Sequence, residues 1–254
     1  MATRADGIIT LHNRASLARI APEYLSIVEA TTTHCRRVLG DELLEIRILG
    51  SVARGDAVPG TSDIDFAAIT QEPVASELRA EIERWAAEAS TRYPQVFAVD
   101  VDLYDLPALE ANRSLRLILE TDSASVWGAP QLAAGDRTFT TAELAGLWNI
   151  RVDGMAMKYE ETVRQAPDEG LAGLSRVVGK DILKCWRMRT VTTRGVFDQA
   201  MPQLYARLKG EWPAYEHLFE ELWSLYRRPT TDRERILRVL RSALEIERGF
   251  DRRA

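Results

Sequence analysis

The spacing of apolar residues divides the chain into two regions. In the first region, segments with an apolar residue at every third or fourth position alternate with short segments that are apolar throughout or at every second position. The first spacing is typical of a helix with one buried face, and the second is typical of a β-strand. The pattern predicts helices over residues 22–39, 72–92 and 106–119, and strands over residues 43–49, 63–69, 96–104 and 125–127.

The second region, from residue 140 onward, has helical spacing only. Gly195, Gly210 and Pro229 interrupt it at points where helices are expected to end. The expected helices cover residues 140–165, 170–192, 198–208, 213–226 and 231–248. The fold class that follows is α/β (α+β), with a small mixed-sheet domain over residues 1–135 and an all-α helical bundle over residues 136–254.

Composition narrows the class of protein. Of the 254 residues, 46% are hydrophobic and 28% are charged, which is ordinary for a globular protein. No apolar run approaches the ~20 residues that cross a bilayer, and the N-terminus lacks the pattern of a signal peptide. The two cysteines, Cys35 and Cys185, are too few for a disulfide framework and are expected to be inert and partly buried. We expect a soluble cytoplasmic protein.

Charge is distributed unevenly along the chain. Residues 1–130 contain 20 acidic residues and 12 arginines, whereas residues 131–254 contain 18 acidic and 21 basic residues, including all four lysines. This asymmetry suggests two structural units with different functions, and chance variation of surface charge is the alternative. A broad nucleic-acid surface needs clustered basic residues, which the net charge of −5 does not favour. We therefore expect neither a nucleic acid nor a membrane as a partner.

The segment over residues 49–66, LGSVARGDAVPGTSDIDF, contains the candidate chemistry. On a strand, residues i and i+2 point to the same face, so Asp63 and Asp65 project together. Ile64 and Phe66 then face the core. Two adjacent carboxylates repel each other, and a divalent cation removes that repulsion. Carboxylate and phosphate oxygens together suit Mg²⁺, so the segment predicts a magnesium site.

Gly50 and Ser51 end the preceding strand. Glycine lets the backbone approach a phosphate closely, and the Ser51 hydroxyl and the amides that follow it can hold phosphate oxygens. The strand that ends at Gly50 is expected to lie beside the strand that carries Asp63. Phosphate-binding and metal-binding groups would then meet at one edge of the sheet.

This arrangement resembles the signature of the nucleotidyltransferase superfamily typified by DNA polymerase beta. That signature is an apolar residue followed by Gly-Ser, a short spacer, and Asp-x-Asp among apolar residues. Here 11 residues separate Ser51 from Asp63. The sequences ARG at residues 53–55 and TS at residues 61–62 are similar to those of the small bacterial members.

The superfamily carries a third carboxylate on a later strand. Residues 99–103, VDVDL, offer Asp100 and Asp102 on one strand face. The flanking sequence VDLYDL is more similar to the superfamily at Asp102, so Asp102 is the predicted third carboxylate and Asp100 the alternative. The resemblance implies that Asp63, Asp65 and Asp102 are the catalytic, metal-binding residues and that Asp102 receives the acceptor's proton.

The resemblance also implies a reaction. Enzymes of this superfamily transfer a nucleoside monophosphate, usually AMP, from ATP with Mg²⁺ to a hydroxyl group and release pyrophosphate. The C-terminal half loosely resembles the helical domain of aminoglycoside nucleotidyltransferases, which implies a small hydroxylated acceptor such as an antibiotic. In the first domain, the residues expected to bind the nucleotide are Gly50, Ser51, Arg54 and Ser62.

Basic residues also gather on one side of the helix expected over residues 170–192, opposite its apolar residues. At about 100° per residue, the basic residues on this side are Arg176, Lys180, Lys184 and Arg187. Lys180 and Lys184 are predicted to contact the β and γ phosphates and to stabilise the leaving pyrophosphate. A solvated basic face and a role in binding the acceptor alone are the alternatives.

Two other functions fit the same motifs. One is nucleotidyl transfer to a macromolecule, a protein or a tRNA end, as in toxin–antitoxin relatives. The other is binding of ATP by an interaction module without transfer. Transfer to a small molecule is the leading hypothesis. All the acidic residues that the resemblance requires are present, which argues against a module that only binds ATP.

Overall fold

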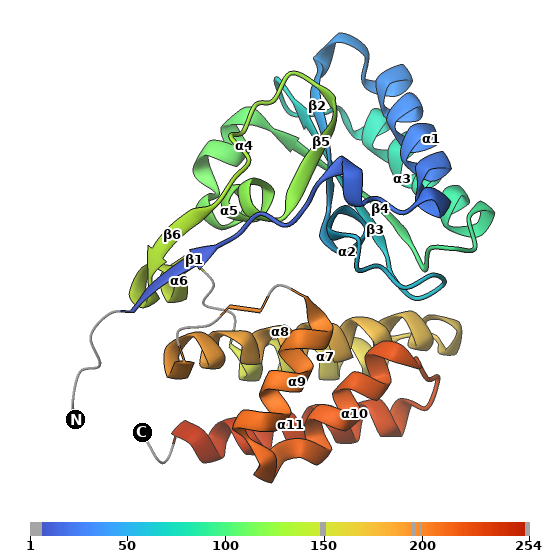
Figure 1. Cartoon of the computed structure of the whole chain (residues 1–254). Helices are drawn as coiled ribbons and strands as arrows, with labels where there is room; N and C mark the ends of the chain where they lie inside the picture. The colour runs from blue at the N-terminus through green and yellow to red at the C-terminus, as the bar shows by residue number, and fades with distance from the viewer. Residues whose placement is uncertain (1–6, 148–150, 195–196, 199, 252–254) are drawn as a thin grey trace. The chain divides into compact units, whose positions relative to one another are not determined.

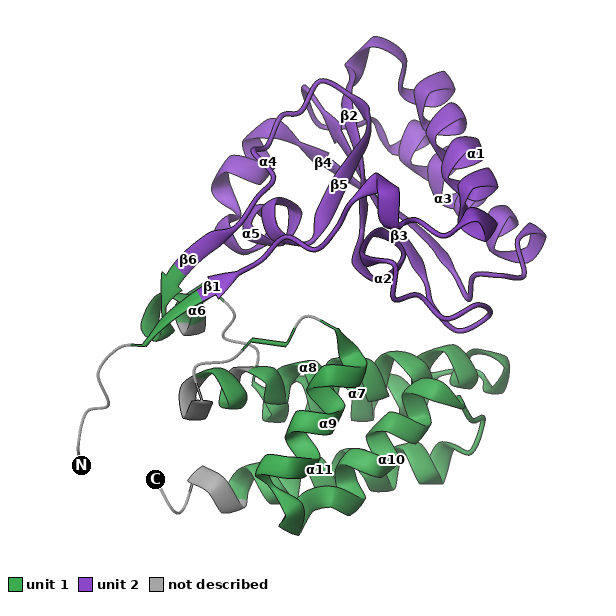
Figure 2. Cartoon of the chain, in the orientation of Figure 1, with its two compact units in different colours: residues 1–9, 139–254 green, residues 10–138 purple. Residues whose placement is uncertain are grey.

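The computed structural model describes residues 7–147, 151–194, 197–198 and 200–251. They form two compact units (Figure 2): a sheet unit over residues 10–138, and a helical unit over residues 1–9 and 139–254. The expected fold class is confirmed, because a mixed sheet with helices is followed by a bundle of helices. The chain passes between the units within a two-stranded sheet that the apolar pattern did not predict. Its strands are β1 (Ile8–Leu11) and β6 (Arg137–Thr140).

A four-stranded sheet with the order β4-β3-β2-β5 forms the centre of the sheet unit. Its strands are β2 (Leu43–Leu49), β3 (Ile64–Thr70), β4 (Val99–Asp105) and β5 (Ser123–Gly128). β2 pairs antiparallel with β3 and with β5, whereas β3 and β4 are parallel. The predicted strands are therefore confirmed, and β5 lies at an edge of the sheet.

Helices pack on both faces of this sheet (Figure 1). One face is covered by α1 (Pro22–Leu39) and α3 (Ser76–Arg92), the other by α4 (Leu106–Ala111) and α5 (Arg113–Thr121). Ile64 and Phe66 are buried in the core with α1 and α3, as predicted, whereas Ala67 and Ile69 are buried in the core with α4 and α5. Because side chains alternate along β3, Asp65 lies on the same face as Ala67, beyond the residues that those helices bury.

A single helix was predicted over residues 106–119, but Asn112 divides it. The backbone of Asn112 is not helical, with φ −104° and ψ 85°, and its side-chain oxygen accepts a hydrogen bond from the Leu115 N–H at 3.1 Å. Asparagine commonly caps a helix in this way, because its oxygen satisfies an N–H group of the first turn. Asn112 therefore ends α4 and begins α5.

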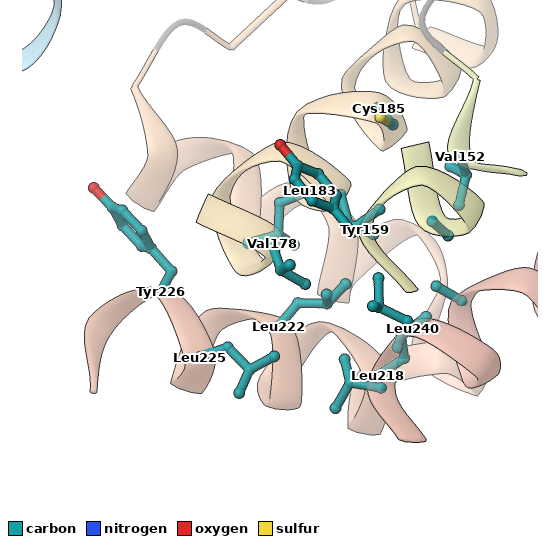
Figure 3. Close-up of a cluster of buried hydrophobic side chains, with 14 of the residues drawn as sticks. Val152, Tyr159, Val178, Leu183, Cys185, Leu218, Leu222, Leu225, Tyr226 and Leu240 are labelled. Carbon is teal, nitrogen blue, oxygen red and sulfur yellow. The ribbon is translucent and has the colours of Figure 1, made fainter. Parts of the chain in front are cut away.

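The helical unit contains α6 (Thr141–Leu147), α7 (Val152–Gln165), α8 (Leu171–Arg194), α9 (Met201–Glu211), α10 (Glu216–Arg227) and α11 (Arg233–Asp251). The helix predicted over residues 140–165 includes residues 148–150, and the one over residues 198–208 includes residue 199; these positions lie outside the described residues. Buried side chains from α7, α8, α10 and α11 share one core (Figure 3). None of the described helices has both the length and the apolar character that crossing a membrane requires.

One glycine sets how closely two of these helices approach. A Cβ on Gly179 of α8 would lie 2.4 Å from the Leu222 carbonyl oxygen and 2.7 Å from the Tyr226 nitrogen, both in α10. These distances are shorter than any real Cβ contact, and both neighbours are backbone atoms. The packing of α8 against α10 therefore requires glycine at this position.

Candidate functional site

Three carboxylates meet on the face of the sheet that α4 and α5 leave open. Asp63 directly precedes β3, Asp65 lies within it, and Asp100 lies opposite Asp65 on β4. Each of the three offers an oxygen, and these oxygens lie within 4.8 Å of one another. Asp63 and Asp65 are half-buried and Asp100 is exposed. Three converging hard oxygen ligands fit a divalent cation, because the cation offsets their mutual repulsion.

The structure brings Asp100 to this cluster in place of the predicted Asp102. In the parallel register of β3 and β4, Asp102 lies opposite Ala67, two residues farther along the sheet from Asp65. Sequence similarity around Asp102 favoured it, but the depth of a side chain in the sheet depends on strand register, which those flanks do not define. The choice between the two aspartates is therefore corrected to Asp100.

Asp102 has a partner of its own on the same strand. The Tyr104 hydroxyl donates a hydrogen bond to Asp102 Oδ2 at 2.9 Å. Burial raises the pKa of Tyr104, and the negative charges of Asp102 and Asp65 raise it further. Tyr104 therefore stays protonated at neutral pH and remains a hydrogen-bond donor to Asp102.

The Gly50-Ser51 turn lies beside the carboxylates. Leu49, the last residue of β2, pairs with Asp65 across the antiparallel ladder, and Gly50 begins the short helix α2 (Gly50–Arg54). Gly50 has φ +69°, and a Cβ at this position would lie 3.0 Å from Asp65 Oδ2. Glycine is needed for both reasons, the positive φ and the close carboxylate. Ser51, the next residue, is half-buried in α2.

The sequence of this region matches the family model of the nucleotidyltransferase domain over residues 34–104. The chain carries a nucleotidyltransferase domain. The matched residues run from α1 to β4 and contain the Gly50-Ser51 turn and the three clustered carboxylates. No curated protein sequence matches the chain.

Solved structures of similar fold include spectinomycin adenyltransferase AAD(9) from Enterococcus faecialis with ATP and spectinomycin. It is 12% identical, with a TM-score of 0.51 over 87% of this chain and 98% of that chain. A toxin–antitoxin structure with AMP-PNP is 25% identical, with a TM-score of 0.30 over 41% of this chain and 75% of that chain. A nucleotidyltransferase-like protein from Exiguobacterium sibiricum is 13% identical, with a TM-score of 0.25 over 88% and 75% of the two chains. At this identity, the match to the adenyltransferase shows a shared fold.

Two residues predicted to bind the nucleotide have structural partners within the sheet unit. Arg54 is 8% exposed, and its Nη1 donates to both carboxylate oxygens of Asp122, at 2.6 and 2.5 Å. Ser62 is 3% exposed, and its Oγ accepts a hydrogen bond from the Val58 N–H at 2.8 Å. The buried positions of both side chains therefore argue against the predicted nucleotide contacts, which sequence similarity alone had suggested.

Lys180 and Lys184 lie on α8, in the helical unit. Lys184 is exposed and Lys180 half-buried, and Lys184 Nζ lies 4.0 Å from Asp181 Oδ1. Arg176 does not belong to an exposed basic face with them: it is 2% exposed, and its guanidinium lies over the Tyr226 ring at 4.7 Å. That part of the predicted stripe is wrong, because α10 covers this turn of α8. The contact of the two lysines with a triphosphate stays a prediction.

Sequence reasoning missed Asp122 altogether. This residue follows α5, and its partner Arg54 is 68 positions earlier in the chain. No local spacing connects two residues so far apart. Asp100, in contrast, could have been chosen from the sequence if the register of β3 and β4 had been known.

Proposed function

We propose that this nucleotidyltransferase moves AMP from ATP to a hydroxyl group of a small molecule, with Mg²⁺, and releases pyrophosphate. The observation that carries the proposal is the meeting of Asp63, Asp65 and Asp100 beside the Gly50-Ser51 turn. A close backbone turn next to clustered carboxylates provides groups for both the phosphates and a cation.

The donor set of the site fits Mg²⁺, because aspartate oxygens are the hard ligands that this ion prefers. Asp63, Asp65 and Asp100 would hold it, and when bound it neutralises negative charge and polarises a phosphate oxygen. Ser51 would hold phosphate oxygens through its hydroxyl. Asp100, the exposed member of the three, would accept the proton of the attacking hydroxyl.

Charge supports a cationic acceptor. Residues 10–138, the sheet unit, contain 20 acidic residues and 12 arginines. A surface of one sign raises the local concentration of ligands of the other sign, so an acceptor with ammonium groups, such as an aminoglycoside, is favoured. The spectinomycin adenyltransferase of similar fold was crystallised with ATP and spectinomycin, which supports an antibiotic as the acceptor.

A pyrophosphate-release screen tests the proposal. The protein, ATP and Mg²⁺ are mixed with spectinomycin, a panel of aminoglycosides, other hydroxylated antibiotics or tRNA, and products are identified by mass spectrometry. We expect release with at least one small acceptor and an adenylylated product. Asp63→Asn and Asp65→Asn should abolish it, whereas Glu110→Gln, which removes an exposed charge from α4, should not.

Other outcomes would change the function assigned. If labelled ATP in a cell lysate marked a protein or an RNA and no small molecule, the acceptor would be a macromolecule. If the protein bound ATP in calorimetry but no acceptor released pyrophosphate, it would be a binding module. Unchanged transfer in both aspartate variants would reject the carboxylate site itself.

A further inference from the structure

Asp122 contacts both ends of the short helix that carries the Gly50-Ser51 turn. Its backbone carbonyl accepts a hydrogen bond from the Gly50 N–H at 3.2 Å, at the start of α2. Its carboxylate accepts two hydrogen bonds from Arg54 Nη1, at the end of α2. One residue between α5 and β5 therefore holds the first and the last residue of α2.

The Arg54 guanidinium is fully engaged by carboxylates of its own unit. It is buried between two carboxylates, since its Nε also donates to Asp56 Oδ2 at 3.3 Å. Burial acts to lower the pKa of Arg54, but the two carboxylates more than offset it, so the net pKa is raised. A guanidinium that is enclosed and neutralised in this way has little charge left for a phosphate.

The end of α2 is closed by backbone contacts that complement the ion pair. The Asp56 N–H donates to the Ser51 carbonyl at 3.0 Å, and Gly55 has φ +74°, as is usual where a helix ends. A Cβ on Gly55 would lie 2.7 Å from the Arg19 carbonyl oxygen. The turn is thus packed tightly on one side and held by Asp122 on the other.

We propose that Arg54 is a positioning residue and does not bind the nucleotide: through Asp122 it holds the Gly50-Ser51 turn against Asp65. This inference rests on the proposed function, which assigns that turn to the phosphates. Loss of the ion pair releases the end of α2 and lets Gly50 move away from Asp65. The pair therefore contributes to ATP binding through the geometry of the turn.

The two possible roles of Arg54 predict opposite effects of Asp122→Asn. If Arg54 positions the turn, this isosteric change weakens the ion pair and lowers the affinity for ATP by about tenfold or more. If Arg54 binds a phosphate, removing its carboxylate partner leaves ATP affinity unchanged or increases it. Calorimetry with a non-hydrolysable ATP analogue and Mg²⁺ measures the difference, at temperatures where far-UV circular dichroism shows the variant folded.

A double-mutant cycle adds a second criterion. We expect the same loss of ATP affinity in Arg54→Lys, in Asp122→Asn and in the double variant, because all three break the same contact. Arg116→Lys is the matched control, since Arg116 also pairs with a carboxylate of the sheet unit, Glu120, but is about half exposed. Additive losses in the double variant would overturn the proposal.

A measurement without nucleotide separates this inference from the proposed function. In the ligand-free protein, Arg54→Lys should speed the hydrogen exchange of the Gly50 amide. The change weakens the ion pair with Asp122, whose backbone carbonyl accepts the hydrogen bond of that amide. The Gly60 amide, which bonds to the Gln95 carbonyl, should be unaffected. Unchanged exchange at Gly50 would reject the positioning role, whereas failure of the wild-type protein to transfer AMP would reject only the proposed reaction.

Discussion

Asp100 lies directly opposite Asp65 in the parallel register of β3 and β4. One oxygen of each of these carboxylates and one of Asp63 lie within 4.8 Å of one another. The two strands come from segments 35 residues apart, so this convergence depends on their pairing alone. It separates Asp100 from Asp102, although both lie on one face of β4. The register therefore decides which side chain completes the cluster.

Asp100→Asn should lower kcat by about a hundredfold or more, because it removes one of three ligands of the metal and the group assigned to the acceptor's proton. Asp102 lies two residues farther along β4, outside the cluster, so Asp102→Asn should have a milder effect. Steady-state pyrophosphate release at saturating ATP and acceptor measures both. A larger loss in Asp102→Asn than in Asp100→Asn would restore Asp102 as the third carboxylate.

Gly50→Ala should reduce transfer strongly and destabilise the protein. The cost has two parts: the positive φ, of about 1–2 kcal/mol, and the Cβ contact with Asp65 Oδ2. Gly40→Ala is the matched control, because Gly40 has φ +55° but no atom within 4 Å of the Cβ position. It should lose a similar stability in urea denaturation and keep its activity. Equal activity in the two variants would show that Gly50 is not close to the reacting groups.

Lys180→Ala and Lys184→Ala should each raise the KM for ATP by about tenfold or more, which corresponds to ~1.4 kcal/mol of lost interaction. The reason is that the two lysines are predicted to contact the negatively charged β and γ phosphates, which leave as pyrophosphate. Lys158→Ala, an exposed lysine of α7, is the control and should leave the KM unchanged. If the two variants altered only the acceptor's KM, the lysines would belong to acceptor binding.

Gly179→Ala should destabilise the helical unit by about 1–3 kcal/mol, since a Cβ would overlap backbone atoms of α10 and force α8 to shift. Gly173→Ala tests the same change on the same helix at a position with open space. It should stabilise the protein by about 0.5–1 kcal/mol, because alanine favours helix. Chemical denaturation of both variants measures the difference, and equal stabilities would contradict the close helix packing.

Neither cysteine should react with a thiol reagent in the native protein at pH 8. Burial raises the pKa of Cys35 to about 12, and burial with the nearby Asp181 and Glu247 charges raises the pKa of Cys185 to about 12. In the unfolded chain, thiols ionise at about pH 8.5. The two buried thiols therefore contribute their full stabilisation below that pH, and this contribution is lost as the pH rises toward 12. Ellman's reagent should detect both thiols only after denaturation. Rapid reaction of a native thiol would contradict its burial.

Local sequence was enough to predict most elements of this fold. The run LLEIRIL, the DIDF motif and the helical spacing over residues 22–39 each depend on near neighbours in the chain, and all were confirmed as β2, β3 and α1. The short strands β1 and β6 were not found, because four residues carry too little periodicity and each strand exists only through the other.

The sequence by itself predicted the class of site, because Gly50-Ser51 and Asp63-x-Asp65 lie within one short segment, at the end of β2 and at the start of β3. Only the tertiary structure decided between Asp100 and Asp102, since strand register is a relation between distant segments. Tertiary structure also enclosed Arg54 with Asp122, a residue 68 positions later in the chain. Burial of a charge requires a partner, and the chain brings that partner only when it folds.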